Sequence, residues 1–530
     1  MKPYGGQAPH KRRNIVTKVI LKLREWLFSR VVVVGLLIVI QIALLTLAVL
    51  RLSRYFAVFY GIFMLLSVIM TLAVIDKEEN PSYKLAWVIP IMAFPLFGGF
   101  FYLMFGNPRL SHRLSERLTR EQDRLTALMP PCREACAQAA ALGEELRNQS
   151  EYIARTGFPP FARTETTYLS PGEEKFRAML AALEKAERYI FLEYFIIEEG
   201  VMWNSILEIL ERKAAQGVEV RVIYDGFGCL LTLPDDYFKT LRSKGIRCIE
   251  FNPLIPVLTM FMNNRDHRKI LVIDGHTGFM GGVNLADEYI NARVKFGHWK
   301  DAAVMLHGDA VWSLVIMFLT MWDSLSDERA SDPERFRPLP EELPEHKNGL
   351  VQPYTDSPLD REQVGEMVYL NIINRAHRYL YICTPYLIVD NETVTALLLA
   401  AKSGVDVRII TPHIGDKWYV HLLTRAYYPQ LVRGGVKIYE YTPGFIHSKT
   451  FVADDRVATV GTINLDYRSL YLHFECGVWM ADTSCIGEIR EDFLRTLQCC
   501  EQVTPDSPLL RMGGFKQLIR AVLRLFAPLM

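Results

Sequence analysis

The sequence predicts an α/β fold made of two copies of one domain, related by pseudo-two-fold symmetry and preceded by transmembrane helices. Three observations predict it: a polar motif that occurs twice, an alternation of strand and helix patterns that also occurs twice, and a long apolar run near the N-terminus. A chain of 530 residues is long enough to bury large cores in two or three domains.

The composition narrows the class of protein. The 60 basic and 59 acidic residues give a net charge of +1, which offers no global argument for nucleic-acid binding. The nine cysteines are an odd number without CxxC spacing, so they indicate reduced thiols in a cytoplasmic environment rather than a disulfide framework.

The N-terminal part predicts a basic cytoplasmic tail, residues 1–30, and a transmembrane region, residues 31–106. Val31–Leu50 is an uncharged run whose 20 residues would span about 30 Å as a helix, the thickness of a bilayer core. Phe56–Ile75 is a second candidate span. Leu85–Phe105 is a third, but its prolines and glycines favour a kinked or re-entrant segment.

The number of spans conflicts with the charges around them. Three full spans from a cytoplasmic N-terminus would put the rest of the chain outside, whereas the arginines after the third segment favour the inside. We give weight to these arginines and to the reduced cysteines, and place the rest of the chain in the cytoplasm. The arginines are Arg109, Arg113, Arg117, Arg120 and Arg124.

The remaining chain predicts connecting helices over 107–165 and then two similar α/β domains. The first domain, 166–323, has helix patterns over 173–187 and 203–216 and strand patterns over 189–197, 218–224 and 247–251. The second domain, 349–510, repeats this order with helices over 363–378 and 394–403 and strands over 379–388, 405–410 and 436–441. Alternating strands and helices predict a sheet covered by helices in each domain.

A short internal match supports the duplication: Gly217-Val218-Glu219-Val220-Arg221 resembles Gly404-Val405-Asp406-Val407-Arg408. Between the domains, residues 324–348 are rich in Pro, Glu, Asp and Arg and predict an exposed linker. Residues 511–530 predict an amphipathic C-terminal helix. Such a helix either lies on an anionic bilayer surface or docks on the protein, and the sequence leaves both open.

The residues that carry chemistry form a motif with the spacing His-x-Lys-x4-Asp, followed by Gly and Asn. Each residue of the second copy follows its counterpart by 180 positions. A lone histidine on an apolar strand is usually a core residue, but packing does not require the same polar residues twice in register. The motif positions are His267, Lys269, Asp274 and Asn284 in the first copy and His447, Lys449, Asp454 and Asn464 in the second.

This set of side chains is suited to a phosphate. A histidine and a lysine two residues apart on a strand point to the same side, so two copies face to face would surround one point. We assign phosphate binding to Lys269, Asn284, Lys449 and Asn464, since ammonium and amide groups donate to phosphate oxygens. One imidazole would attack phosphorus while the other moves protons. The lysines beside the histidines argue against a metal site.

Each histidine needs an acceptor on its other ring nitrogen to fix its tautomer and its direction. Asp301, after the first motif, and Glu475, after the second, are the candidates for this orienting role. Asp274 and Asp454 fall at strand ends, where we expect structural ion pairing rather than proton transfer.

The duplicated motif resembles the HKD signature of the phospholipase D superfamily and, within it, the bacterial cardiolipin synthases. The resemblance covers nearly the whole chain, from Asn80-Pro81-Ser82-Tyr83 to the C-terminal end, and includes Thr384-Pro385-Tyr386. His473 departs from the pattern, because relatives often have Asn before Phe-Glu. Two stretches carry the resemblance most clearly: Gly282-Val283-Asn284-Leu285-Ala286-Asp287-Glu288-Tyr289 and Asn464-Leu465-Asp466-Tyr467-Arg468-Ser469-Leu470.

The resemblance implies two phospholipase D-like domains and phosphatidyl transfer between two phosphatidylglycerol molecules, giving cardiolipin and glycerol without a cofactor. It also implies phospholipid substrates, a multi-pass protein of the bacterial cell membrane, His267 as nucleophile and His447 as acid and base. On sequence grounds alone the two histidines can exchange roles. The catalytic set carried over is His267, Lys269, Asp274, His447, Lys449 and Asp454.

Two other functions fit the same residues. With water as acceptor the chain would be a phospholipase D-type phosphodiesterase, and membrane spans argue against a nuclease, so we expect no nucleic-acid partner. A membrane scaffold with a vestigial site is disfavoured by two complete motifs. The oligomeric state, the acyl-chain preference and the donor headgroup do not follow from the residues.

Overall fold

The computed structural model describes residues 39, 42–43, 46–47, 56–95, 97–106, 112–130, 132–253, 263–327, 331–340, 343–345, 349–360, 362–510 and 514–529. The chain divides into two compact units. The first comprises Met1–Glu78, Trp87–Asn107 and Pro253–Met260, and the second comprises Glu79–Ala86, Pro108–Asn252 and Phe261–Met530.

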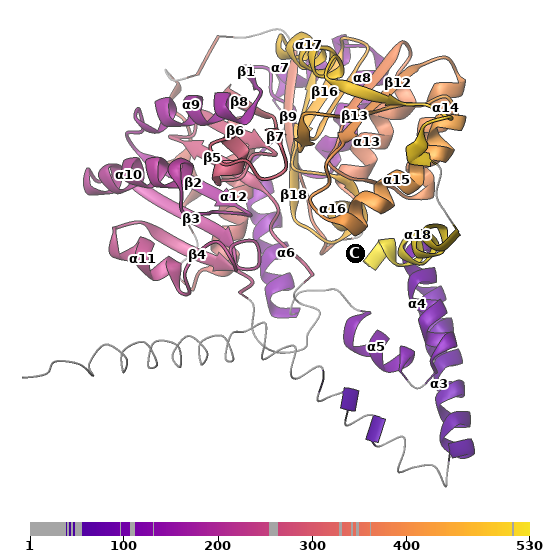
Figure 1. Ribbon diagram of the computed structural model, residues 1–530. Helices are drawn as coiled ribbons and strands as arrows, with labels where there is room; N and C mark the ends of the chain where they lie inside the picture. Colours follow the sequence, from indigo (N-terminus) through magenta and orange to yellow (C-terminus); the bar gives the residue numbers. More distant parts are fainter. Residues whose placement is uncertain are drawn as a thin grey trace, which may run out of the picture. The chain divides into compact units, whose positions relative to one another are not determined.

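The first unit contains the apolar helix α3, Phe56–Asp76, where the sequence predicts the second span (Figure 1). Within the described residues, Val58–Asp76 is the one helix long and apolar enough to cross a membrane. The first predicted span, Val31–Leu50, lies almost wholly outside the described residues. The third is not one helix, because the chain breaks between α4, Pro81–Ala93, and α5, Gly98–Phe105.

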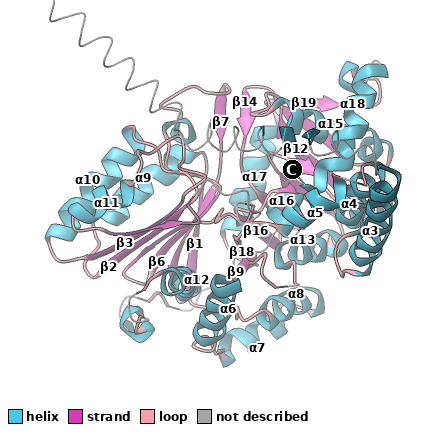
Figure 2. Ribbon diagram, turned by 90° about the horizontal axis from the view of Figure 1, so that it is seen from below, coloured by secondary structure: helices cyan, strands magenta, loops and turns pink. Residues whose placement is uncertain are grey.

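The second unit contains two mixed sheets, which confirms the predicted duplicated α/β fold (Figures 1 and 2). The seven-stranded sheet has the order β1-β8-β6-β5-β2-β3-β4, and β2, β3 and β4 run parallel. Its strands are β1 Thr164–Leu169, β2 Tyr189–Tyr194, β3 Glu219–Asp225, β4 Arg247–Phe251, β5 Lys269–Ile273, β6 Thr277–Gly281 and β8 Ala303–Gly308.

The second sheet, read from its other edge, has the order β9-β18-β16-β15-β10-β12-β13-β19, and β10, β12 and β13 run parallel. Its first seven positions therefore match the first sheet strand for strand. The strands are β9 Leu350–Asp356, β10 Tyr379–Cys383, β12 Asp406–Pro412, β13 Lys437–Tyr441, β15 Thr450–Ala453, β16 Val457–Gly461, β18 Glu475–Ala481 and β19 Cys500–Val503.

Helices cover both faces of the first sheet because neighbouring residues of a buried strand point to opposite faces. Leu271 packs with the face that holds α9 and α10, whereas Val272 packs with the face that holds α12. The helix α12 is apolar almost all round, which suits its burial against the sheet. These helices are α9 Gly172–Leu183, α10 Val201–Ala215, α11 Tyr237–Ser243 and α12 Val311–Leu325.

The connector and the second half are helical where the sequence predicts it. α6 packs on α12, where Arg124 Nη2 lies 2.8 Å from Asp323 Oδ2. The connector helices are α6 His112–Thr126, α7 Arg133–Ala141 and α8 Glu144–Arg155, and the helices of the second half are α13 Val364–Arg375, α14 Asn391–Lys402, α15 Trp418–Arg433, α16 Tyr467–Tyr471 and α17 Cys485–Leu497.

One prediction about the connections differs from the structure, and one alternative that the sequence left open is observed. The predicted exposed linker contains the short helix η4, Pro333–Phe336, whose Phe336 is buried and lies edge-on to Phe191. The C-terminal helix α18, Gly514–Phe526, docks on the protein through Arg524, which lies over the Tyr427 ring of α15. Its Leu518 and Val522 remain exposed, so the helix keeps an apolar outer surface.

Candidate active site

The two histidines lie just ahead of two equivalent strands. One residue separates His267 from the start of β5, and two residues separate His447 from the start of β15. Each strand runs antiparallel to the first parallel strand of its sheet, pairing Lys269 with Tyr194 and Thr450 with Cys383. Both histidines are thereby placed at the carboxyl ends of the parallel strands, the edge where α/β proteins build their sites.

Backbone pairing between the halves brings these two edges together. The strand β14, Gly444–Ile446, pairs in parallel with β7, His298–Lys300, and His447 N donates to Lys300 O at 2.7 Å. In the other direction Asp266 bridges to Phe474, and His267 N donates to Phe474 O at 2.9 Å. The approach to each histidine is therefore fixed by main chain from the opposite half.

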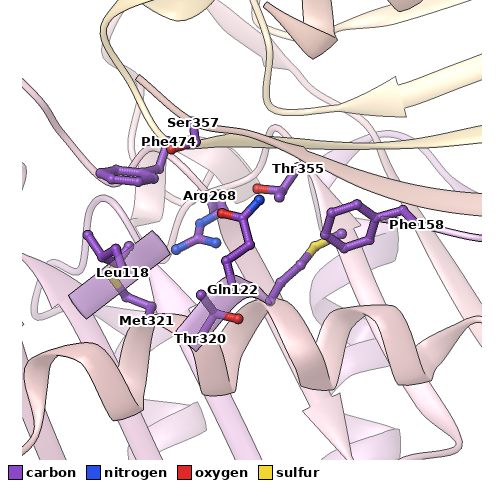
Figure 3. Close-up of a pocket in the computed structure, with 10 residues that line it drawn as sticks. Leu118, Gln122, Phe158, Arg268, Thr320, Met321, Thr355, Ser357 and Phe474 are labelled. Atoms are coloured by element: carbon purple, nitrogen blue, oxygen red, sulfur yellow. The ribbon is translucent and has the colours of Figure 1, made fainter. Parts of the chain in front are cut away.

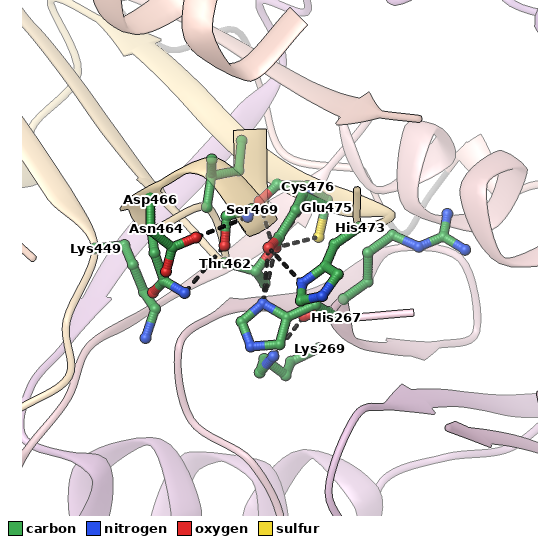
Figure 4. A network of polar contacts seen from close by, with 12 residues as sticks. His267, Lys269, Lys449, Thr462, Asn464, Asp466, Ser469, His473, Glu475 and Cys476 are labelled. Carbon is green, nitrogen blue, oxygen red and sulfur yellow. Dashed lines mark hydrogen bonds and ion pairs between the residues drawn. The ribbon is translucent and has the colours of Figure 1, made fainter. Parts of the chain in front are cut away.

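The side chains also pair between the halves, because each histidine contacts a carboxylate of the opposite half. His267 Nδ1 lies 2.9 Å from Glu475 Oε1, and His447 Nδ1 lies 2.6 Å from Asp301 Oδ2. Figure 4 shows Glu475 above the His267 ring, Lys269 below the ring and Lys449 to its left. The acceptor on Nδ1 places the ring proton there and leaves the Nε2 lone pair available. Each half thus supplies the orienting carboxylate for the other half's imidazole.

The two carboxylates have different additional partners, and Glu475 Oε2 also lies 3.0 Å from His267 Nδ1. Asp301 Oδ1 accepts from Ala302 N at 2.7 Å. A Cβ on Gly282 would lie 2.2 Å from that oxygen, so the glycine lets the shorter carboxylate approach. At the position of Gly282, 180 residues later, Thr462 donates its hydroxyl to Glu475 Oε2.

Both lysines of the motif are buried beside the histidines. Lys269 Nζ donates to His267 O, and Lys449 Nζ lies 2.8 Å from His447 Nδ1. Burial lowers the pKa of Lys269 to about 8 and that of Lys449 to about 7, against the opposing attraction of nearby carboxylates. The two ammonium groups can therefore gain or lose charge near neutral pH.

The histidines are neutral for a similar reason. Burial, and then the neighbouring Lys449, lowers the pKa of His447 to about 4, although Asp301 raises it. Burial, and then Lys269 and Lys449, holds the pKa of His267 well below its usual value. A negatively charged ligand between the lysines would raise both pKa values, because it favours the protonated rings.

The two aspartates of the motif bind backbone, not the expected cationic side chains. The Asp274 carboxylate accepts from the N–H groups of Glu187, Arg188 and Tyr189, each at 2.8 Å. The Asp454 carboxylate accepts from the N–H groups of the equivalent residues His377, Arg378 and Tyr379, at 2.7 to 2.9 Å. The two aspartates therefore stabilise the turns before β2 and β10 and hold these strands against β5 and β15.

The two asparagines are buried and already form bonds inside the protein. Asn284 Nδ2 donates to Tyr289 OH at 2.7 Å, and its Oδ1 accepts from Ile196 N. Asn464 Nδ2 donates to Ser469 Oγ at 3.0 Å. Each amide nitrogen carries a second hydrogen, and that N–H is the one a phosphate oxygen would use.

Sequence reasoning missed Lys175 and Thr462. Lys175 on α9 is fully buried, donates to Val283 O at 2.9 Å, and has its pKa lowered to about 7 by burial. A signal was present, since Lys175 shares the spacing of the buried Met179 and Leu183 on one helix face. Thr462 had no such signal, because its role appears only with Glu475 beside it.

A small cavity lies behind this site, where α6, α12 and β9 meet (Figure 3). Arg268, the neighbour of His267, reaches it beside Gln122 and Thr320. Its volume of about 20 Å³ fits one water molecule. It is too small for a lipid headgroup, so it is part of the packing between the halves.

Comparison with known proteins identifies the family. The model described as "Cardiolipin synthase, PLD-like domain" matches residues 179–297 and 369–497, and a phospholipase D-nuclease N-terminal model matches residues 62–107. A cardiolipin synthase of Geobacillus sp. (strain WCH70) is 36% identical over 468 residues, covering 88% of this chain and 92% of the relative. The chain belongs to the phospholipase D-like cardiolipin synthase family. As a member of that family it is an enzyme, a phosphatidyltransferase.

Two other proteins resemble this chain, one in sequence and one in fold. An uncharacterized protein of Streptococcus mutans serotype c is 45% identical over 460 residues, 87% of this chain and 99% of that protein. The crystal structure of phosphatidylserine synthase from Haemophilus influenzae Rd KW20 has a TM-score of 0.54 at 16% identity, covering 72% of this chain and 97% of that structure. The solved structure of phosphatidylserine synthase supports the fold described here for this member of the cardiolipin synthase family.

Proposed function

We propose that the chain is a cardiolipin synthase, which transfers a phosphatidyl group from one phosphatidylglycerol to another and releases glycerol. The observation that carries this proposal is the crossed arrangement of His267 with Glu475 and His447 with Asp301. Two neutral imidazoles with fixed tautomers, flanked by two buried lysines, suit a two-step transfer at a phosphodiester.

In the first step, His267 Nε2 attacks phosphorus, so that a P–N bond forms and the P–O bond to the departing glycerol breaks. Protonated His447 gives its proton to the glycerol oxygen. Burial lowers the pKa of free His447 to about 4, so this proton is taken up when the anionic phosphodiester binds. Lys269 and Lys449 stabilise the charge that develops on the non-bridging oxygens.

In the second step, the terminal hydroxyl of a second phosphatidylglycerol replaces glycerol. His447 removes the proton of this hydroxyl, the oxygen attacks phosphorus, and the P–N bond breaks to return neutral His267. Glu475 and Asp301 act through the rings as positioning residues. Asn284 and Asn464 would donate their second N–H groups to the phosphate, and Asp274 and Asp454 would maintain the strands.

The substrate and the location are part of the same proposal. The apolar helix α3 and the exposed Leu518 and Val522 of α18 suit a protein held at a bilayer. We propose a multi-pass membrane protein with its catalytic domains, 166–323 and 349–510, in the cytoplasm, as the arginines after residue 107 suggest.

The deciding experiment uses full-length protein in vesicles of labelled phosphatidylglycerol. We expect cardiolipin and free glycerol in equal amounts, and the same preparation carrying His267→Ala supplies the background rate. Phosphatidic acid as the sole product would replace the proposal by the phospholipase D-type hydrolase, because water would then be the acceptor.

A further inference from the structure

A third histidine lies against the His267–Glu475 pair. The His473 ring centroid is 5.5 Å from that of His267, and its Nδ1 is 3.7 Å from Glu475 Oε1. Figure 4 shows the three side chains gathered at one point. His267 comes from the first half, His473 and Glu475 come from the second half, and all three are buried.

The proposed transfer reaction gives His473 no task. Its side chain is only 8% exposed, and within the described part of the chain neither ring nitrogen has a hydrogen-bond partner. Buried polar groups are nearly always satisfied, so an imidazole with two open nitrogens indicates an absent ligand. A ligand here must accept the lone pair of a neutral ring or the N–H of its other nitrogen.

The three side chains form a donor set for a metal ion. Each offers one donor atom, and these atoms lie within 4.8 Å of one another. Tetrahedral zinc, with bonds of about 2.0–2.2 Å to nitrogen and oxygen, needs donors roughly 3.3–3.5 Å apart. The contacts of Glu475 Oε1, at 2.9 Å to His267 and 3.7 Å to His473, bracket that spacing.

We propose that His267, His473 and Glu475 bind a Zn²⁺ ion and that this ion inhibits the enzyme. Two imidazoles and one carboxylate are a known donor set for zinc with an open fourth position. The set does not suit Mg²⁺, which prefers oxygen ligands in an octahedron. The ion would be an inhibitor and not a cofactor, because the proposed transfer needs the His267 Nε2 lone pair free to attack phosphorus.

Two cations oppose such an ion. Lys269 donates to the His267 carbonyl, and Lys449 lies beside His447 on the other side of the site. Their ammonium groups donate to the backbone carbonyls of His267 and His447, however, and not to the three donor atoms of the proposed site. Glu475 supplies the negative charge that the incoming ion needs.

The effect on turnover rests on the proposed function, whereas metal binding itself does not. Zinc bound to His267 Nδ1 leaves the ring's single proton on Nε2, so the lone pair that would attack phosphorus is lost. Zinc bound to Nε2 occupies that lone pair directly. Zinc at Nδ1 also separates Glu475 from the ring that it orients.

The test is zinc binding to the purified full-length protein without lipid, measured by calorimetric titration with zinc chloride. We expect one strong site in the wild type and at least about tenfold weaker binding in His473→Asn. The matched control is His377→Asn, which removes another histidine that contacts a carboxylate, 2.7 Å from Glu145 on the exposed surface. Equal affinity in the wild type and in His473→Asn would overturn the proposal.

Cobalt keeps the test decisive if His473→Asn does not fold. Wild-type protein titrated with Co²⁺ should give the visible absorption of a four-coordinate ion, and zinc should abolish it while Mg²⁺ should not. Absence of that spectrum in the folded wild type would also overturn the site. Because no lipid is present, either result is independent of whether the enzyme makes cardiolipin.

Inhibition is measured as the ratio of each protein's rate with zinc to its own rate without metal. We expect a fall of at least about tenfold for the wild type at a zinc concentration that saturates the calorimetric site, and a smaller fall for His473→Asn. A wild-type rate that zinc at saturation leaves unchanged would reject the inhibitory role.

Discussion

His267 and Glu475 are separated by 208 residues in the chain, yet the imidazole Nδ1 lies 2.9 Å from the carboxylate Oε1. The reciprocal pair, His447 and Asp301, is separated by 146 residues and lies at 2.6 Å. Each histidine is therefore oriented by the other half, and the two half-sites depend on each other.

Replacing either histidine should stop the reaction. His267→Ala removes the proposed nucleophile and His447→Ala the proton carrier, so each should lower cardiolipin formation by at least about 10³-fold at normal protein level. His377→Ala, on the exposed surface, is the control. Turnover like that of the wild type in either active-site variant would contradict the two-histidine mechanism.

Removing an orienting carboxylate should lower kcat more than it changes KM. Glu475→Gln and Asp301→Asn keep the shape of the side chain but remove the charge that fixes the Nδ1 proton, and each should lower kcat by about 10²–10⁴-fold. The crossed pairing makes a sharper prediction. Glu475→Gln should add little to His267→Ala, because both act on the same ring. Additive losses in that double variant would contradict the pairing.

Anion binding should weaken as pH rises through about 7 to 8. The pKa of Lys449 is lowered to about 7 and that of Lys269 to about 8, so both ammonium groups lose their charge in this range. The affinity for tungstate, whose own charge stays constant there, should fall by up to about tenfold per pH unit for each group. Lys449→Arg keeps its charge and should move the fall to higher pH. A flat profile would contradict the role of the lysines.

The motif aspartates should matter for stability. Asp274→Ala leaves three backbone N–H groups without their acceptor, which should lower the free energy of unfolding by about 2–4 kcal/mol. Asp274→Asn keeps one acceptor oxygen and should lose less. Chemical denaturation measures the change, and the kcat of the folded fraction should stay near the wild-type value. A normal melting curve with no activity would assign the residue to catalysis.

Metal chelation should not reduce activity. The proposed reaction uses two imidazoles and two ammonium groups, so EDTA should leave the rate unchanged or raise it by removing traces of zinc from the inhibitory site. Loss of activity in EDTA, restored by Mg²⁺, would contradict the mechanism.

Local patterns predicted the fold closely. The strand pattern over 247–251 coincides with β4, and the two halves match strand for strand because the apolar spacing and the motif were both repeated. The break between α4 and α5 follows from prolines and glycines that the sequence displays. By contrast, the burial of Phe336 could not be predicted, since it depends on an aromatic cluster assembled from distant residues.

The candidate site was predictable in its residue types and not in its connections. The sequence pointed to Asp301 and Glu475 as acceptors, but which ring each one holds depends on the pairing of β7 with β14 and of Asp266 with Phe474. The partners of Asp274 were expected to be charged side chains, whereas the turn ahead of β2 presents backbone N–H groups instead. His473 appeared as a departure from a pattern, and only its neighbours give it a chemical meaning.

The exchange of carboxylates between the halves has a consequence for how such a chain can arise. Two identical subunits related by a two-fold axis would complete each other's sites in the same way, so joining them end to end would need only a connecting segment. After such a fusion the copies could diverge, as Gly282 and Thr462 have done around their carboxylates, provided that each substitution suited the histidine across the axis.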